Sequence, residues 1–271
     1  GGVAIFAAGN EGLNYTCYPG AYNQFISVAA NAPDGLPTGY TNYHYGCNIA
    51  SPGGDFEYVD GVLNPNGAIL STVPSETPDV YNNGKTTYGA DYAYMSGTSM
   101  ACPHVSGVAA LGLAYAKQQK RHFTWKEFKN LMYSSARDID SYFVGEKLYY
   151  MRHNSAGATP IKMTLEEYKG KMGRLADAGA LLKAIDGAGR DTRLPNLYLA
   201  PEESLTLDLT YYNIEDAKGA SVANEAIAEA TLEGNNLTIS AKTEGQTTLT
   251  IEATKSHTVT ITVRRGASDN G

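Results

Sequence analysis

The stretch that decides the fold reads Ser96-Gly97-Thr98-Ser99-Met100-Ala101-Cys102-Pro103-His104-Val105-Ser106-Gly107. A hydroxyl-rich turn with a glycine leads here into small and apolar residues, a pattern typical of a buried helix. If the helix begins at Ser99, its first N–H groups lack partners inside the helix and carry the positive end of its dipole. The Ser99 hydroxyl can then act as a nucleophile, and its amide can stabilise a developing oxyanion. A serine there is also a common helix N-cap, but the whole twelve-residue context favours the nucleophile.

A second informative stretch lies near the start of the chain and reads Val3-Ala4-Ile5-Phe6-Ala7-Ala8-Gly9-Asn10-Glu11-Gly12. The apolar residues predict a buried strand, and Gly9 permits a sharp turn after it. Strands of an open α/β sheet point their carboxyl ends at the ligand crevice, so the Asn10 amide is expected to face a substrate. Asparagine is also a common turn former, and only the context favours the functional interpretation.

Both stretches resemble motifs of the subtilisin-like serine proteases (subtilases, peptidase family S8). Residues 96–107 resemble the nucleophile motif, in which the second hydroxyl residue after the glycine attacks the scissile carbonyl and matches Ser99. Residues 3–12 resemble the strand and turn that carry the oxyanion-hole asparagine, which matches Asn10. The resemblance implies a serine endopeptidase that hydrolyses peptide bonds through an acyl-enzyme on Ser99. It also implies protein or peptide substrates and no cofactor for catalysis.

The resemblance covers residues 1–187, which we interpret as the C-terminal portion of a subtilase catalytic domain. It implies an α/β fold, with a partial subtilisin-like parallel sheet and flanking helices. We expect the helix from Ser99 to about Lys117 to be buried on all sides, because small or apolar residues occupy nearly every face. Thr124 and Glu127 form the sequence pattern of a capping box, which predicts a second helix through about Ser135.

The resemblance also implies residues that bind substrate. Ala7, Ala8 and Gly9 would line one wall of the primary specificity pocket, with Cys17 near its floor and Thr98 beside the nucleophile. The alternative is that the three small residues are only part of a core strand. A further alternative concerns Glu11, which either attracts a basic substrate residue or is a solvated carboxylate in a turn.

The same resemblance requires a histidine base and an orienting aspartate upstream of Asn10, and the sequence lacks both motifs. None of the five histidines (His44, His104, His122, His153 and His257) stands in a His-Gly-Thr-His context, and no aspartate precedes Ser-Gly or Thr-Gly. His104 follows Ser99 by five residues, a spacing that directs the two side chains to different faces of one helix. We therefore expect the base to come from outside this chain.

The chain starts with Gly1-Gly2 rather than with methionine and enters an apolar strand at once, which we interpret as truncation. The missing N-terminal half of the catalytic domain is then an expected partner. Loss of base and orienting group together lowers turnover by about 10⁶, so the isolated chain is expected to be inactive. The alternative is a catalytically inactive subtilase-like scaffold.

Composition excludes several classes of partner. The 271 residues include 21 Lys and Arg against 28 Asp and Glu, a net charge of −7. Basic residues are scattered, whereas nucleic-acid binding needs a clustered positive surface. No apolar run reaches membrane-spanning length, so no membrane span is expected. By resemblance, the protein is expected to be secreted or at the cell surface.

The cysteines and two of the aspartates give only weak evidence for a disulfide or a metal site. Cys17, Cys47 and Cys102 are an odd number without metal-ligand spacing, which favours buried free thiols. A disulfide between Cys17 and Cys47 is the less favoured alternative. Asp55 and Asp79 are candidates for a structural calcium site, because many subtilases hold calcium, but the sequence contains no oxygen-ligand loop of defined spacing and predicts no metal.

The hydrophobic period changes from helical to two after a glycine-containing linker at residues 188–193. Leucine, isoleucine and valine alternate with polar residues in four short segments, each typical of a half-buried strand. They are Leu205–Leu209, Leu237–Ile239, Leu249–Ile251 and Val259–Val263. Residues 194–266 are therefore predicted to form a small antiparallel β-sandwich, followed by a tail at 267–271. This module resembles immunoglobulin-like or cadherin-like modules and, in the scaffold alternative, binds a surface ligand.

Overall fold

A computed structural model describes residues 2–15, 17–55, 57–59, 62–74, 91–153, 157–187, 194, 196–212 and 214–264. The linker predicted at 188–193, the tail at 267–271 and Asp79 lie outside the described residues. No helix in the described part is long and apolar enough to cross a membrane.

Four parallel strands form the sheet that positions the candidate site. They lie in the order β1 (Ile5–Ala7), β2 (Ile26–Asn31), β3 (Cys47–Pro52) and β10 (Arg174–Leu175). Every residue of β2 is buried, as expected for a strand that is covered on both faces of a parallel sheet. The prediction of a partial parallel sheet is confirmed.

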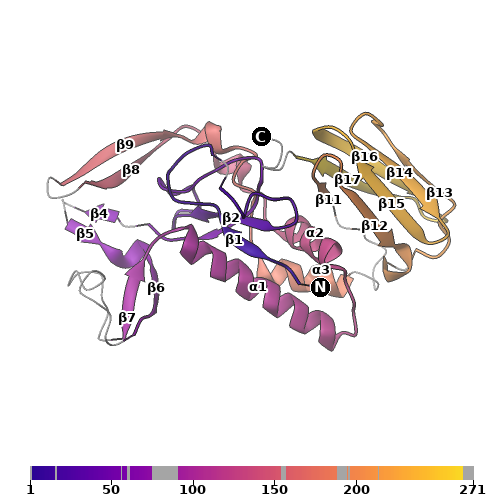
Figure 1. The fold of residues 1–271 in the computed structure, drawn as a ribbon, viewed down its shortest axis with the longest axis horizontal. Coiled ribbons are helices and arrows are strands. Elements are labelled where there is room, and N and C mark those ends of the chain that lie inside the picture. Colours follow the sequence, from indigo (N-terminus) through magenta and orange to yellow (C-terminus); the bar gives the residue numbers. More distant parts are fainter. Residues whose placement is uncertain are drawn as a thin grey trace.

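Helices cover one face of this sheet (Figure 1). They are α1 (Thr98–Gln118), α2 (Trp125–Ser135) and α3 (Ala178–Gly187). Ile26, Val28 and Ile49 of the sheet pack in one buried cluster with residues of all three helices. The opposite face, with Ala29 and Ala50, packs against the segment 139–172, which contains the 3₁₀ turns η2 (Asp140–Tyr142) and η3 (Leu165–Tyr168).

Helix α1 differs from its prediction in one respect. It begins at Thr98, one residue earlier than expected, and the expectation that it is buried on all sides is wrong. Leu111 and Leu113 are 49% and 45% exposed, and Gly107 and Ala114 are also exposed. The reason is that α1 packs on the sheet and on α3 along the side that carries Ala101, Val105, Ala109 and Gly112.

Helix α2 begins as the sequence predicts. Thr124 accepts a hydrogen bond from the Glu127 N–H (3.2 Å), and the Glu127 carboxylate accepts one from the Thr124 N–H (2.7 Å). These reciprocal bonds satisfy two amides that the first helical turn leaves unpaired. The predicted capping box is confirmed.

Three two-stranded ribbons extend from this core. They are β4 (Glu57–Val59) with β5 (Val62–Asn64), β6 (Ile69–Thr72) with β7 (Tyr92–Met95), and β8 (Glu146–His153) with β9 (Gly157–Thr164). A short 3₁₀ turn, η1 (Pro65–Gly67), separates β5 from β6. Strand β7 leads directly into the turn before α1.

The C-terminal part contains two further sheets. One has the order β11 (Leu197–Leu199), β17 (His257–Val263), β16 (Gly245–Glu252) and β13 (Gly219–Val222), and the other β12 (Ser204–Asp208), β15 (Asn236–Ala241) and β14 (Ala228–Glu233). The 3₁₀ turn η4 (Leu209–Tyr212) follows β12 and contains Leu209, which the alternation had placed in a strand. Apolar side chains from both sheets form one buried cluster, so the two sheets share a core.

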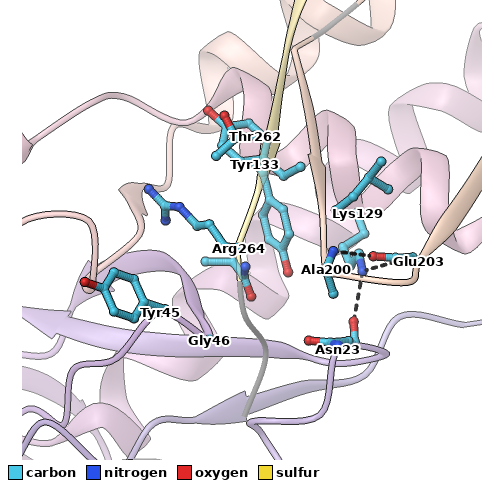
Figure 2. A pocket seen from close by; sticks show the side chains of 12 residues that line it. Asn23, Tyr45, Gly46, Lys129, Tyr133, Ala200, Glu203, Thr262 and Arg264 are labelled. Atoms are coloured by element: carbon cyan, nitrogen blue, oxygen red, sulfur yellow. Dashed lines mark hydrogen bonds and ion pairs between the residues drawn. The ribbon is translucent and has the colours of Figure 1, made fainter. Parts of the chain in front are cut away.

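A network of polar contacts joins the part of the chain with the parallel sheet to the C-terminal part with the two further sheets. Figure 2 shows the Lys129 ammonium, which donates to the main-chain oxygen of Asn23 (2.9 Å) and lies 3.5 Å from the Glu203 carboxylate. The side chains of Lys129 and Glu203 are only 4% and 11% exposed, and burial lowers the pKa of Lys129. Asn130 accepts a hydrogen bond from the Tyr198 N–H (2.6 Å), and Arg174 donates to the Tyr198 hydroxyl (2.7 Å).

We predict that Glu203→Gln destabilises the protein, because it leaves the ammonium of Lys129 buried without its counter-charge. The expected loss of unfolding free energy is about 2 kcal/mol, measured by urea denaturation. The matched control is Glu146→Gln, which removes the charge from an exposed pair with Lys162 (2.8 Å), and no measurable change is expected. Equal effects of the two substitutions would show that the junction pair contributes nothing beyond a surface contact.

Candidate active site

The chain turns sharply where β1 ends. Gly9 has φ 104°, in the region that favours glycine, and a Cβ atom there would lie 2.4 Å from the Asn42 side-chain nitrogen. The turn brings Asn10 to the surface at the carboxyl end of β1. This is the edge of a parallel sheet at which ligands usually bind.

Asn42 holds this turn. Its side-chain oxygen accepts hydrogen bonds from the N–H groups of Glu11 (3.1 Å) and Leu13 (3.2 Å), and its nitrogen donates to the Ala8 carbonyl (3.2 Å) and to the Glu11 carboxylate. Asn42 is fully buried, so its bond to the Ala8 carbonyl is shielded from water, whereas its bonds to Glu11 and Leu13 are partly buried. The contact also gives Glu11 a structural partner within the turn.

Thr98 connects the same turn to helix α1. The Asn10 side-chain oxygen accepts hydrogen bonds from the Thr98 N–H (2.8 Å) and from the Thr98 hydroxyl (2.9 Å). The Thr98 hydroxyl oxygen in turn accepts a bond from the Gly9 N–H (3.2 Å). With its oxygen held in this way, the Asn10 amide directs its NH₂ group away from Thr98, and no acceptor for that group lies among the described residues.

Ser99 is the second residue of α1 and its side chain is exposed. The N–H groups of Met100 and Ala101 donate to the Gly97 carbonyl (2.9 and 3.2 Å). The Ser99 N–H, in contrast, has no acceptor within the described ranges, as is usual for the first turn of a helix. An exposed hydroxyl, an unpaired amide and the NH₂ group of Asn10 therefore lie close together at the positive end of the α1 dipole.

The described histidines do not supply a base to Ser99. The His104 ring nitrogen Nδ1 lies 2.8 Å from the Met100 carbonyl oxygen on the same helix. His44 is buried, accepts a hydrogen bond from the Gly46 N–H (2.9 Å), and has a pKa lowered to about 4 by burial. His122 follows the end of α1 and His257 begins β17, and among the described side chains neither is hydrogen-bonded to Ser99. His153 ends β8, and its side chain lies outside the described part.

The structure also places the proposed substrate-binding residues. Ala7, Gly9 and Cys17 are partly exposed, whereas Ala8 and Thr98 are fully buried. The loop with Cys17 packs beside β1, since a Cβ at Gly20 would lie 2.9 Å from that of Phe6. The hydrogen bonds of Thr98 give it the position of a residue that orients Asn10.

The three cysteines are free thiols in the structure. Burial raises the pKa of Cys47 to about 11 and also raises the pKa of Cys102, whose sulfur lies 3.6 Å from the Ile5 carbonyl oxygen. Both are therefore protonated at neutral pH and are poor nucleophiles. No group of three or more His, Cys, Asp or Glu that could hold a metal is present among the described residues.

Local sequence motifs did not reveal Asn42 or the orienting role of Thr98. Asn42 lies 31 residues from Glu11, in a stretch without a recognisable pattern. Its role depends on the parallel pairing that brings the turn at residues 8–13 near residues 40–43. That proximity is a property of the tertiary structure and leaves no local motif in the sequence.

We predict that Asn42→Ala loosens the turn that presents Asn10. The substitution removes the four hydrogen bonds of a buried side chain, so we expect a loss of about 2–4 kcal/mol in unfolding free energy. Hydrogen exchange should accelerate at the amides of Glu11 and Leu13. Gln24→Ala, at an exposed position, is the control. Unchanged exchange at both amides in Asn42→Ala would contradict the anchoring role.

We also predict a pH dependence from His44. Its pKa in the folded protein, about 4, lies below the ordinary 6.5, so the unfolded chain binds more protons between these values. The stability from this group is complete above pH 6.5 and is lost as the pH falls towards 4. Between pH 7 and pH 5 we expect a loss of about 2 kcal/mol from this group. His44→Asn keeps an acceptor for the Gly46 N–H and should lack this component in denaturation at both pH values; an equal loss in both proteins would exclude His44 as its source.

Several known proteases resemble part of this chain. An extracellular basic protease of Dichelobacter nodosus is 32% identical over 133 residues, which are 49% of this chain and 19% of that protein. A cell wall-associated protease of Bacillus subtilis is 29% identical over 193 residues, 70% of this chain and 18% of that protein. The chain thus spans about a fifth of the length of these relatives. Among solved structures, a protease of Pseudoalteromonas arctica has a TM-score of 0.46 and 28% identity, covering 68% of this chain and 43% of that one.

A comparison with whole families also gives a match. The model that describes the subtilase family matches residues 1–170. This range includes the turn with Asn10, the start of α1 with Ser99, and all strands of the parallel sheet except β10. Because the match extends over more than half of the 271 residues, the chain belongs to the subtilase family.

Proposed function

We propose that this chain carries the nucleophile and the oxyanion hole of a secreted serine endopeptidase. The observation that carries the proposal is the pair of hydrogen bonds from Thr98 to the Asn10 side-chain oxygen. They fix the amide of Asn10 beside Ser99, the first exposed hydroxyl of helix α1. Family membership and the extracellular proteases among the relatives support both the chemistry and the compartment.

The chemistry follows from these groups. The Ser99 oxygen attacks the scissile carbonyl carbon, its proton passes to a base, and the carbonyl electrons move onto the carbonyl oxygen. The Asn10 NH₂ group and the Ser99 N–H donate hydrogen bonds to that oxyanion. The tetrahedral adduct then expels the amine, which takes the proton from the base. A water molecule attacks the resulting ester of Ser99 by the same steps and releases the acid.

The base and its aspartate are proposed to come from polypeptide outside this chain. Two surfaces of the described part suit that partner. Strand β1 is the edge strand of the parallel sheet, with main-chain groups open to a further strand. The exposed side of α1, with Gly107, Leu111 and Ala114, offers small and apolar residues on a helix that contacts β1. A partner that covers both would deliver its side chains close to Ser99.

The proposal also assigns residues to substrate binding. Ala7, Gly9 and Cys17 line the primary specificity pocket, Ala8 lies behind them, and Thr98 positions Asn10.

The proposal divides the chain into two domains. Residues 1–187 form the catalytic portion, and 194–266 form an immunoglobulin-like or cadherin-like module after a linker at 188–193. The sharing of one core by two sheets supports the module assignment. The rival is a subtilase-like scaffold without catalysis whose module binds a surface ligand.

We predict that a fluorophosphonate probe labels Ser99 only when the Asp- and His-bearing polypeptide is supplied, in cis or in trans. The adduct is mapped by mass spectrometry. Ser99→Ala should abolish labelling, whereas Ser106→Ala, at an exposed serine on the same helix, should leave it intact. Asn10→Ala should lower peptide turnover by roughly 10²–10³, the magnitude known for such donors.

Two outcomes decide between the alternatives. If Ser99 stays unlabelled in the complemented, folded protein, the scaffold is the correct assignment. If the purified 271-residue chain cleaves peptides alone, and Ser99→Ala abolishes that activity, the chain contains its own base and the partner requirement is wrong.

A further inference from the structure

A groove lies at the surface of the junction between α2 and the C-terminal sheets, away from Ser99. It encloses about 420 Å³, within the roughly 300–1,000 Å³ that small-molecule sites occupy. Eight residues line it: Asn23, Gln24, Trp125, Lys126, Pro201, Glu202, Glu203 and Ser204. They come from the loop before β2, the first turn of α2 and the segment that leads into β12.

Trp125 is the single tryptophan of the chain, and it forms a fixed, half-buried wall of this groove. The ammonium groups of Lys129 and Lys126 lie 5.3 and 5.6 Å from the centre of its ring. Each lysine is itself held, Lys129 by Asn23 and Glu203 and Lys126 by the Ser204 carbonyl (2.8 Å). These contacts hold the indole in one orientation at the wall of the groove.

The groove also presents polar side chains that the protein does not use internally. Gln24 and Glu202 are exposed, and neither side chain has a hydrogen-bond or ion-pair partner within the described ranges. Glu202 has φ 64°, a left-handed backbone that is costly for a residue other than glycine. Its N–H donates to the Ala241 carbonyl (3.0 Å), which holds it there. The turn accounts for this backbone, since the Glu203 N–H donates to the Ala200 carbonyl (3.1 Å) with Pro201 and Glu202 at the two central positions. The exposed carboxylate of Glu202 lies at the groove.

The groove carries charges of both signs, which favours neither an anion nor a cation over a neutral ligand. The carboxylates of Glu202 and Glu203 disfavour an anion such as a phosphate, and the ammonium of Lys126 disfavours a cation. Only Trp125 and Pro201 offer apolar surface, which is too little for a lipid chain. A neutral ligand that carries many hydrogen-bonding groups remains.

An extended peptide is also disfavoured, although β12 is the edge strand of its sheet. The first carbonyl of β12, that of Ser204, already accepts a hydrogen bond from Lys126. A peptide that added a strand would need that main-chain group, and a lysine at an edge is a common means of preventing such pairing. The groups left for a ligand are side-chain amide, carboxylate and hydroxyl groups.

We propose that this groove binds a neutral carbohydrate. The C–H face of a sugar ring packs on the indole of Trp125, and its hydroxyl groups donate to the Glu202 carboxylate and exchange hydrogen bonds with the Gln24 amide. The site lies at the junction of the two parts of the chain and does not involve Ser99 or Asn10. It adds a binding function that is independent of the proposed peptidase activity.

The test uses the 271-residue chain as it is. A fluorescently labelled sample is applied to an array of several hundred neutral glycans, and the best ligand is then titrated while tryptophan emission is recorded. Because Trp125 is the single tryptophan, a saturable change in emission reports binding at the groove itself. We expect an apparent Kd below about 1 mM for at least one glycan.

Variants locate the site. Glu202→Gln should raise the Kd at least about fivefold, because it removes a charged hydrogen-bond acceptor. Glu225→Gln, at an exposed position outside the groove, should leave the Kd unchanged. A thermal melt shows that both variants are folded. The proposal is overturned if no glycan on the array binds, if binding leaves tryptophan emission unchanged, or if Glu202→Gln and Glu225→Gln behave alike.

Discussion

Two hydrogen bonds from Thr98 to the Asn10 side chain join the end of β1 to the start of α1, across 88 residues of sequence. Without them the parallel sheet and the helix would still pack, but the amide of Asn10 would be free to rotate. With them, one side-chain oxygen is satisfied inside the protein and the NH₂ group remains for an external acceptor. The arrangement uses an asparagine because a carboxylate could accept the same bonds but would lack the donor.

The turn that carries Asn10 depends on buried support. Asn42 satisfies two main-chain amides and one carbonyl of the turn, and Gly9 leaves the space that Asn42 fills. Precise donors near a reacting carbonyl must be oriented before the substrate arrives, since reorientation during the reaction would raise the barrier. Rigidity in this turn is therefore part of the proposed chemistry.

Much of this organisation could be predicted from the sequence, because it depends on residues that are close together along the chain. The strand before Asn10, the helix after Gly97 and the capping box at Thr124 each depend on residues within a few positions of one another. The alternating segments also predicted β12, β15, β16 and β17. Other features depend on contacts between distant segments, and such contacts leave no periodic pattern or motif in the sequence. They are the hydrogen bonds of Asn42 to the turn, the exposed side of α1, and the pairing of Lys129 with Glu203. The same applies to the groove beside Trp125.

The most direct measurement is a crystal structure of this chain, complemented with the Asp- and His-bearing polypeptide, with a peptide aldehyde bound covalently to Ser99. The aldehyde oxygen of the adduct then occupies the position of the oxyanion. We expect it about 2.7–3.1 Å from both the Asn10 side-chain nitrogen and the Ser99 main-chain nitrogen. An adduct whose oxygen points to solvent, with Asn10 no longer bonded to Thr98, would contradict the central claim.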